Sequence, residues 1–294
     1  MKKISGIFLF VLVLFAACNS HKIESSKPVV VVSITPQKYF VQRIADTLVN
    51  VEVMVPPGSS PETYEPTASQ LRLISRAEAY FSLGLLEFEL SMLKSIQKQN
   101  PDLLVVNHSE ELNLLESECL GHSHHEHSHA HSHDPHVWTS PAEVKKIVNK
   151  IVAILEDRFP EHSNTFQKNS EQFLSDIDKL DTFIKSELKE TKINKFFVFH
   201  PALTYYARDY GITQVALEEE GKAPSMKHFK AVLNDAMDQG AKTIFIQKEF
   251  DVNTARTAAD DIGGKVEVID PLEKNWLENM YQITRLLKRA MNGE

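Results

Sequence analysis

The stretch EHSNTFQKNSEQFLSDIDKLDTFIKSELKE, from Glu161 to Glu190, decides the fold because it reads as one long helix between two α/β patterns. It carries no strand signal and few helix breakers. Its apolar side chains recur at helical spacing, at Phe173, Ile177, Leu180, Ile184 and Leu188. A helix of this length rises about 1.5 Å per residue and is about 45 Å long. We therefore expect a stiff strut that joins two domains.

The helical pattern begins earlier in the chain, at Pro141, and Pro160 divides it in two. The first piece has apolar residues at Ile147, Val148, Ile151 and Leu155. We assign residues 141–192 to the linking helices. A helical link differs from the strand links of hinged binding proteins, so we do not expect a large closure of the two domains.

Short apolar runs alternate with helical patterns on both sides of this link. Before it, we expect strands at Val29–Ile34, Val51–Val55, Ala79–Leu83 and Leu103–Val106. After it, we expect strands at Phe196–Phe199, Gln214–Leu217, Thr243–Ile246 and Lys265–Ile269. The pattern predicts an α/β protein of two lobes, residues 28–140 and 193–294, each with a four-stranded, mainly parallel sheet covered by helices.

The start of the chain is typical of an export signal. Two lysines precede an apolar stretch from Ile4 to Leu14, and small residues lead to Cys18. The stretch is too short for a membrane helix, which needs about 20 apolar residues. Ala16-Ala17 before the cysteine resembles a bacterial lipoprotein cleavage box, so we expect a signal peptide over 1–17 and a lipidated tether over 18–27. The alternative is a plain secretory signal.

Composition limits the possible partners and the sources of stability. The chain has 294 residues, 42% of them hydrophobic, which suffices for two cores. It has two cysteines, so lipid on Cys18 would leave Cys119 without an intrachain disulfide partner. The formal net charge of -8 argues against a nucleic-acid partner. We expect a monomer.

Metal-binding residue types follow four of the expected strands. In open parallel sheets, ligands bind beyond the carboxyl ends of the strands, and the residues at those places are Glu62, His136, His200 and Asp270. Each lobe supplies two, so they could meet in the cleft between the lobes. Two imidazoles and two carboxylates suit tetrahedral zinc. Manganese remains possible, because the ligand types of first-row metals overlap.

A polar segment rich in histidine, residues 113–133, interrupts the first lobe, and we expect it to form a mobile loop. Its histidines are His122, His124, His125, His127, His129, His131 and His133. A flexible chain loses entropy when it closes around a metal, so each site there should be weak. We interpret the segment as an auxiliary metal-capture or sensing loop; the alternative is a tolerated insertion. We expect His21, His108, His162 and His228 to be surface residues.

Six motifs in order resemble one protein family over nearly the whole mature chain. They are VSITPQKYFVQRIA, PPGSSPETYEPTASQL, DPHVWTSP, FFVFHPALTYYARDYGI, APSMKHFKAVLNDA and VEVIDPL. The chain resembles the metal-binding solute-binding lipoproteins of bacterial zinc, manganese and iron ABC importers. The resemblance implies two α/β lobes joined by a long helix, a lipid-anchored receptor facing the periplasm or the cell exterior, and a membrane permease with its ATPase as partners.

The same resemblance places the metal ligands. It puts the family's second ligand on His136, the third on His200 and the fourth, where one is used, on Asp270. The first position departs from the family pattern P-H-x-Y-E-P, because this chain has Glu62 in place of that histidine. Glu62 could supply an oxygen, or a water could fill the position. The donor set weakens the assignment to zinc, whereas the histidine-rich loop favours it, and we expect Zn²⁺ with Mn²⁺ or iron as the alternative.

Two other classes of function compete with a transport receptor. A zinc hydrolase needs an open water position and a general base. Glu65 could serve as the base, but a fourth protein ligand would close the metal to the water that hydrolysis needs. A metal-buffering surface adhesin without a transporter could use the same fold. We expect a receptor and not an enzyme.

Overall fold

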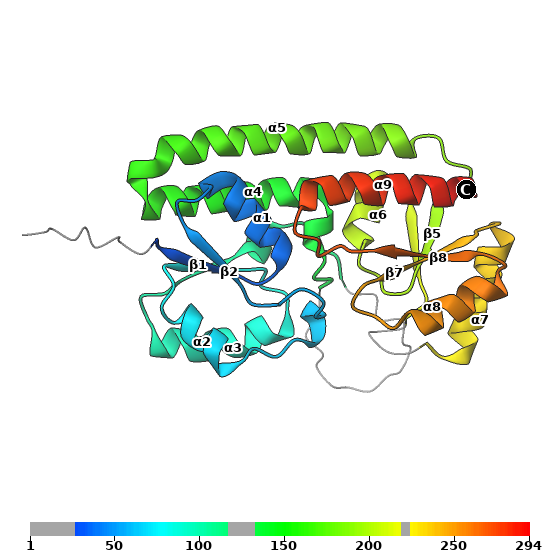
Figure 1. The fold of residues 1–294 in the computed structure, drawn as a ribbon, viewed down its shortest axis with the longest axis horizontal. Helices are drawn as coiled ribbons and strands as arrows, with labels where there is room; N and C mark the ends of the chain where they lie inside the picture. The colour runs from blue at the N-terminus through cyan, green and yellow to red at the C-terminus, as the bar shows by residue number, and fades with distance from the viewer. Residues whose placement is uncertain (1–26, 117–132, 219–223) are drawn as a thin grey trace, which may run out of the picture.

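The computed structural model describes residues 27–116, 133–218 and 224–294, and Figure 1 shows two lobes side by side along one long helix. The N-terminal lobe contains β1 (Val29–Val32), α1 (Thr35–Ala45), β2 (Asn50–Val53), the 3₁₀ helix η1 (Pro61–Thr63), α2 (Ala68–Ile74), β3 (Ala79–Ser82), α3 (Glu87–Gln99), β4 (Leu104–Asn107) and η2 (His108–Glu111). The link contains η3 (Val137–Thr139), α4 (Pro141–Arg158), η4 (Pro160–His162) and α5 (Ser163–Leu188). The C-terminal lobe contains β5 (Lys195–Val198), α6 (Thr204–Tyr210), β6 (Thr213–Ala216), α7 (Met226–Asp238), β7 (Thr243–Gln247), α8 (Val252–Asp261), β8 (Lys265–Ile269) and α9 (Trp276–Asn292).

The two sheets repeat one topology. The strand order is β2-β1-β3-β4 in the first sheet and β6-β5-β7-β8 in the second, and every described pair is parallel. The prediction of two four-stranded parallel sheets is confirmed. In each sheet the strand order changes direction after the first strand, β1 or β5, because the second strand lies on one side of it and the third on the other. Open parallel sheets bind ligands at this switch point.

Burial explains why these short runs form strands. Three of the four valines of β1 are fully buried, and every residue of β3 and of β7 is buried. A strand covered by helices on both faces needs apolar side chains at consecutive positions rather than at alternate ones. β-branched and aromatic residues at these positions favour the extended conformation over the helix.

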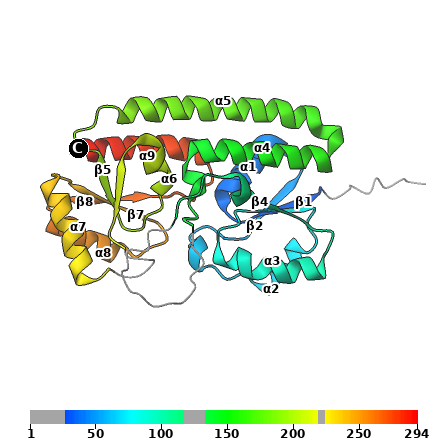
Figure 2. The same cartoon turned by 180° about the vertical axis from the view of Figure 1, so that it is seen from behind.

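The link consists of α4 and α5, divided at Pro160 as expected. Ser140 caps α4 by accepting a hydrogen bond from the backbone N–H of Glu143 at 3.0 Å, and Pro141 occupies the first turn. The 26 residues of α5 span about 39 Å and pass along α4 and α9, as Figures 1 and 2 both show. Its buried apolar face contacts both helices, so α5 joins the two lobes.

Two tryptophans fasten the C-terminal lobe to the link. Trp276, at the start of α9, donates its indole N–H to the carbonyl oxygen of Trp138 at 2.7 Å. Trp138 in turn donates to the carbonyl oxygen of Pro271 at 3.0 Å. The ring of Trp276 also packs edge-on against Phe40 of α1, with centroids 5.2 Å apart. Both indoles are buried and hydrogen-bonded, so these contacts fix how the segment after β8 meets the segment around His136.

Within the described ranges, the helices include none with the length and apolar character that a bilayer crossing requires. The expected signal peptide, the tether and Cys18 lie outside the described residues.

Candidate metal centre

Three side chains from distant parts of the chain converge at one point. Glu62 lies in η1, beyond the carboxyl end of β2; His136 immediately precedes η3; and His200 follows β5 by two residues. One ligand atom from each residue lies within 4.8 Å of the other two. The structure therefore brings together three of the four residues that the sequence analysis selected, with His200 contributed by the second lobe.

The distances within this group fit the edges of one small polyhedron. The Nε2 atoms of His136 and His200 are 3.2 Å apart. Glu62 places Oε2 3.4 Å from the Nε2 of His200 and Oε1 3.9 Å from the Nε2 of His136. Two nitrogens bound tetrahedrally to zinc at about 2.05 Å would be about 3.3 Å apart. The spacing of the two imidazoles thus suits a single tetrahedral ion.

Each imidazole is held from behind by a buried carboxylate. The Nδ1 of His136 lies 2.9 Å from Oδ1 of Asp134, and the Nδ1 of His200 lies 2.7 Å from Oε2 of Glu218. An ionised carboxylate only accepts hydrogen bonds, so each Nδ1 carries a proton, and in the neutral form each ring turns an Nε2 lone pair toward the other. Two lone pairs and a carboxylate then face one space, an arrangement that favours a cation.

The protonation of His136 reflects this surplus of acceptors. Burial lowers its pKa, but the charge and hydrogen bond of Asp134, together with the charges of Glu62 and Glu218, outweigh burial and raise the pKa above the ordinary value. Burial conversely raises the pKa of Asp134, and its contacts with His136 reverse that effect and lower the pKa. Without another cation, a proton is the species that this group attracts.

Asp134 and Glu218 were not among the residues selected from the sequence, although both had a signal. Asp134 belongs to the Asp-Pro-His run and also accepts the backbone N–H of His136 at 2.8 Å. Glu218 is found by strand register: Val198 of β5 pairs with Ala216 of β6, and two further residues along each chain lead to His200 and Glu218. Neighbouring parallel strands thus place His200 next to Glu218, the carboxylate that hydrogen-bonds its ring.

Asp270, the remaining predicted ligand, is not part of the converging group. Its Oδ2 accepts from the ammonium of Lys248 at 2.8 Å, and its Oδ1 accepts from the backbone N–H of Leu272 at 3.0 Å. Both oxygens therefore have donors within the C-terminal lobe. A surface hollow of about 400 Å³ borders Asp270 and Lys248 and extends along α9.

The auxiliary loop can be placed only at its edges. His122, His124, His125, His127, His129 and His131 lie outside the described residues. His133 is described, and it forms an isolated antiparallel bridge with Glu116. Glu116 and His133 are therefore adjacent, and His133 directly precedes Asp134.

The expectation that His108 is a surface residue was wrong. The residue is 2% exposed, and its ring stacks on Phe81 with centroids 5.8 Å apart. Neither ring nitrogen has a hydrogen-bond partner among the described residues. Burial, with a smaller contribution from the charge of Lys150, lowers the pKa of His108 to about 3. A neutral imidazole can fill an apolar position, which sequence alone does not reveal.

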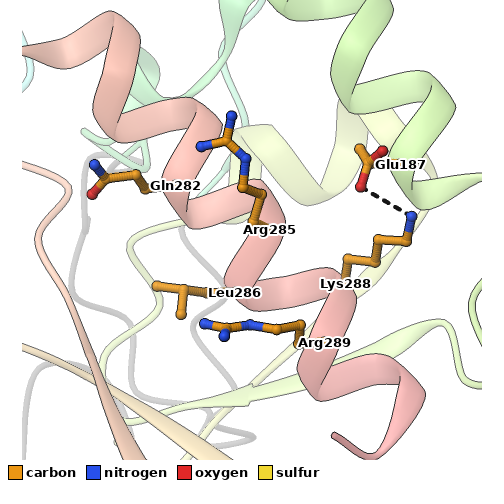
Figure 3. A pocket seen from close by; sticks show the side chains of 6 residues that line it. All are labelled: Glu187, Gln282, Arg285, Leu286, Lys288 and Arg289. Atoms are coloured by element: carbon orange, nitrogen blue, oxygen red, sulfur yellow. Dashed lines mark hydrogen bonds and ion pairs between the residues drawn. The ribbon is translucent and has the colours of Figure 1, made fainter.

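A second surface hollow, of about 490 Å³, lies between α5 and α9 (Figure 3). Arg285, Lys288 and Arg289 of α9 line it, and Lys288 forms an ion pair with Glu187 of α5 at 2.9 Å. None of the predicted site residues borders it. The hollow is therefore separate from the converging ligands.

Solved structures with the same arrangement of two lobes define the class of protein. A crystal structure of ZnuA has a TM-score of 0.82 at 31% identity, covering 90% of this chain and 99% of that chain. Zn(II)-bound AdcA from Streptococcus pneumoniae has a TM-score of 0.75 at 25% identity, covering 91% of this chain and 58% of that chain. The fold is that of two-lobed ZnuA-like proteins.

Sequence comparison identifies the family. Residues 30–290 match the family described as zinc-uptake complex component A, periplasmic, and the chain belongs to this ZnuA family. The chain is 29% identical over 290 residues to the high-affinity zinc uptake system protein ZnuA of Bacillus subtilis, covering 92% of this chain and 89% of the relative. It is 28% identical over 314 residues to zinc-binding lipoprotein AdcA of Streptococcus pneumoniae (strain ATCC BAA-255 / R6), covering 100% of this chain. The chain spans 62% of the length of that AdcA.

Proposed function

We propose that the protein is the extracytoplasmic substrate-binding component of an ABC importer and that it binds one zinc ion between its lobes. The observation that carries the proposal is the pair of buried imidazoles whose Nε2 atoms lie 3.2 Å apart, each supported at Nδ1 by a carboxylate. The protein performs no chemistry on the ion. It holds the ion until a permease receives it.

The geometry of the donors favours zinc over manganese. Two imidazole nitrogens and the Glu62 carboxylate form three vertices of a compact tetrahedron, whereas oxygen-preferring Mn²⁺ takes more ligands. Glu62 is one-third exposed, so its oxygen lies at the solvent edge of the group, while both histidines are buried. The fourth position belongs to Asp270 or to a water.

The proposed path of the ion follows from the relatives. ZnuA of Bacillus subtilis is described as part of a high-affinity zinc uptake system, and AdcA as a zinc-binding lipoprotein. We accordingly assign a signal peptide to 1–17, a tether lipidated at Cys18 to 18–27, and lobes to 28–140 and 193–294 on either side of the linking helices, 141–192. The partners are a permease and its ATPase, and the receptor acts as a monomer.

Metal titration of the mature protein tests this function. Zinc and manganese are each titrated into chelator-stripped protein against a fluorescent chelator, and His136→Ala and His200→Ala are compared with His162→Ala, whose histidine is exposed. We expect one tight zinc site, weaker manganese binding, loss of the tight site in the first two variants and wild-type behaviour in the third. Zinc binding of equal strength in wild type and all three variants would contradict the proposal.

A further inference from the structure

The carboxylate of Asp270 faces an ammonium instead of the imidazoles. Lys248 Nζ lies 2.8 Å from Oδ2 of Asp270 and 3.6 Å from Oε2 of Glu273. The side chain of Lys248 is 55% exposed, whereas that of Asp270 is 17% exposed. The lysine therefore reaches in from solvent to neutralise a largely covered carboxylate.

We call the converging residues Glu62, His136 and His200 the metal group. The segment that carries Lys248 contacts this group through residues on both sides of the lysine. The residue before it, Gln247, donates its side-chain amide to the carbonyl oxygen of His200 at 2.6 Å. Two residues after it, Phe250 stacks on the His200 ring with centroids 5.0 Å apart at 28°. The position of Lys248 is thus tied to a proposed ligand.

Asp270 is tied to the other imidazole in the same way. The next residue, Pro271, accepts the indole N–H of Trp138 at 3.0 Å. The Trp138 ring lies 5.1 Å from the His136 ring. The pair Lys248–Asp270 is therefore connected to His200 through the neighbours of the lysine and to His136 through the neighbour of the aspartate and Trp138.

The charges around this pair favour an added cation. Glu249 interacts electrostatically with Asp270, Lys248 and His200, and burial followed by the charge of Asp270 raises the pKa of Glu249. Two carboxylates, those of Asp270 and Glu273, form ion pairs with the ammonium of Lys248, and Glu249 adds a further electrostatic interaction with it. A divalent ion at the two imidazoles would therefore find the Asp270 carboxylate already paired with the Lys248 ammonium. The neighbouring carboxylates of Glu249 and Glu273 add negative charge that favours a further cation.

We propose that Lys248 is a positioning residue that competes with the bound ion for Asp270. In the metal-free protein, Lys248 holds the carboxylate; on binding, Asp270 turns to the ion as its fourth ligand and Lys248 stays with Glu273. The inference rests on the proposed function, because it requires an ion at Glu62, His136 and His200. It explains why the predicted fourth ligand lies outside the converging group.

The competition is measured by a double-mutant cycle with zinc. Ion pairs with a solvent-exposed partner are weak, so Lys248→Met is expected to tighten zinc binding by about 1.4- to fivefold. In an Asp270→Asn background, the same substitution should change nothing, because the competing carboxylate is gone. Lys248→Arg, which keeps the ion pair, should retain wild-type affinity.

A control separates this effect from the loss of a positive charge. Lys274→Met removes an exposed lysine from the same segment, and we expect it to leave zinc binding unchanged. Folding of each variant is checked by thermal unfolding of the metal-free protein. An affinity gain in Lys248→Met that persists beside Asp270→Asn would overturn the inference, and so would wild-type affinity in a folded Lys248→Met.

Cobalt spectroscopy gives an independent readout. With Asp270 as the fourth ligand, the d–d absorption of bound Co²⁺ should differ between wild type and Asp270→Asn and be unchanged in Lys248→Met. Identical spectra in all three would overturn the inference. Absence of any metal binding by the wild-type imidazoles would instead contradict the proposed function itself, so the two failures are distinguishable.

Discussion

The Nδ1 of His200 lies 2.7 Å from the Oε2 of Glu218, and both side chains are buried. The contact joins the residues that follow two neighbouring parallel strands, β5 and β6. It fixes the ring orientation and the tautomer, so that Nε2 faces the other proposed ligands. We therefore expect the binding of an ion by His200 to depend on a residue outside the proposed ligand set.

Removing the carboxylate of Glu218 should weaken zinc binding although the three proposed ligands remain. We expect about a tenfold loss for Glu218→Gln, whose amide oxygen can still accept a hydrogen bond from Nδ1–H, and up to about 100-fold for Glu218→Ala. Competitive zinc titration measures both. Glu187→Gln, at an ion pair with Lys288 on α5, is the matched control. Wild-type affinity in Glu218→Ala would show that the contact does not support binding.

Replacing Glu62 with histidine should shift metal preference toward zinc. Glu62→His would supply a third imidazole at the position where the family pattern has one, and imidazole favours zinc over manganese more than a carboxylate does. We expect the ratio of zinc to manganese affinity to rise on the order of tenfold, which corresponds to about 1.4 kcal/mol. Parallel titrations with both metals measure the ratio. A ratio unchanged from wild type would indicate that residue 62 is not a ligand.

The sequence was sufficient for the features that depend on local pattern. Runs of consecutive apolar residues, such as those of β1 and β7, predicted the two sheets, and the helical spacing of apolar residues in α5 predicted the link. Both patterns can be recognised in the sequence because each of these side chains packs into a core. The strand-end rule selected Glu62, His136 and His200, which the structure brings together. It could not show that Asp270 faces Lys248, because that pairing depends on how two loops of the folded lobe approach each other.

The buried histidine in the first lobe should make stability depend on pH. The pKa of His108 is lowered to about 3 in the folded protein, whereas an unfolded histidine has a pKa of about 6.5. Between these values the unfolded chain binds the extra proton, so the folded state loses stability as the pH falls from about 6.5 toward 3, by up to about 1.4 kcal/mol per pH unit. Between pH 7 and pH 5, His108 should account for a loss of about 2 kcal/mol.

A variant without the titrating ring tests this assignment. His108→Phe keeps an aromatic ring stacked on Phe81 and removes the proton site. Urea unfolding of the metal-free protein at pH 7 and pH 5 should show a smaller loss in this variant than in wild type by about 2 kcal/mol. His162→Phe, at an exposed position, should show the wild-type loss. Equal losses in wild type and His108→Phe would contradict the effect.

Deleting the histidine-rich loop should leave the tight site intact. Glu116 and His133 form an antiparallel bridge, and the backbone N–H of Asp134 donates to Leu115 at 3.0 Å, so the ends of the loop already lie together. Residues 117–132 can therefore be replaced by Asn-Gly, a two-residue turn suited to antiparallel ends, without moving Asp134 or His136. Six histidines leave with the segment. Equilibrium dialysis should then show fewer weakly bound zinc ions per chain, with one tight ion retained at wild-type affinity. Loss of the tight ion would indicate that the loop contributes a ligand to the tight site. An unchanged number of weakly bound ions would contradict an auxiliary metal-binding role for the loop.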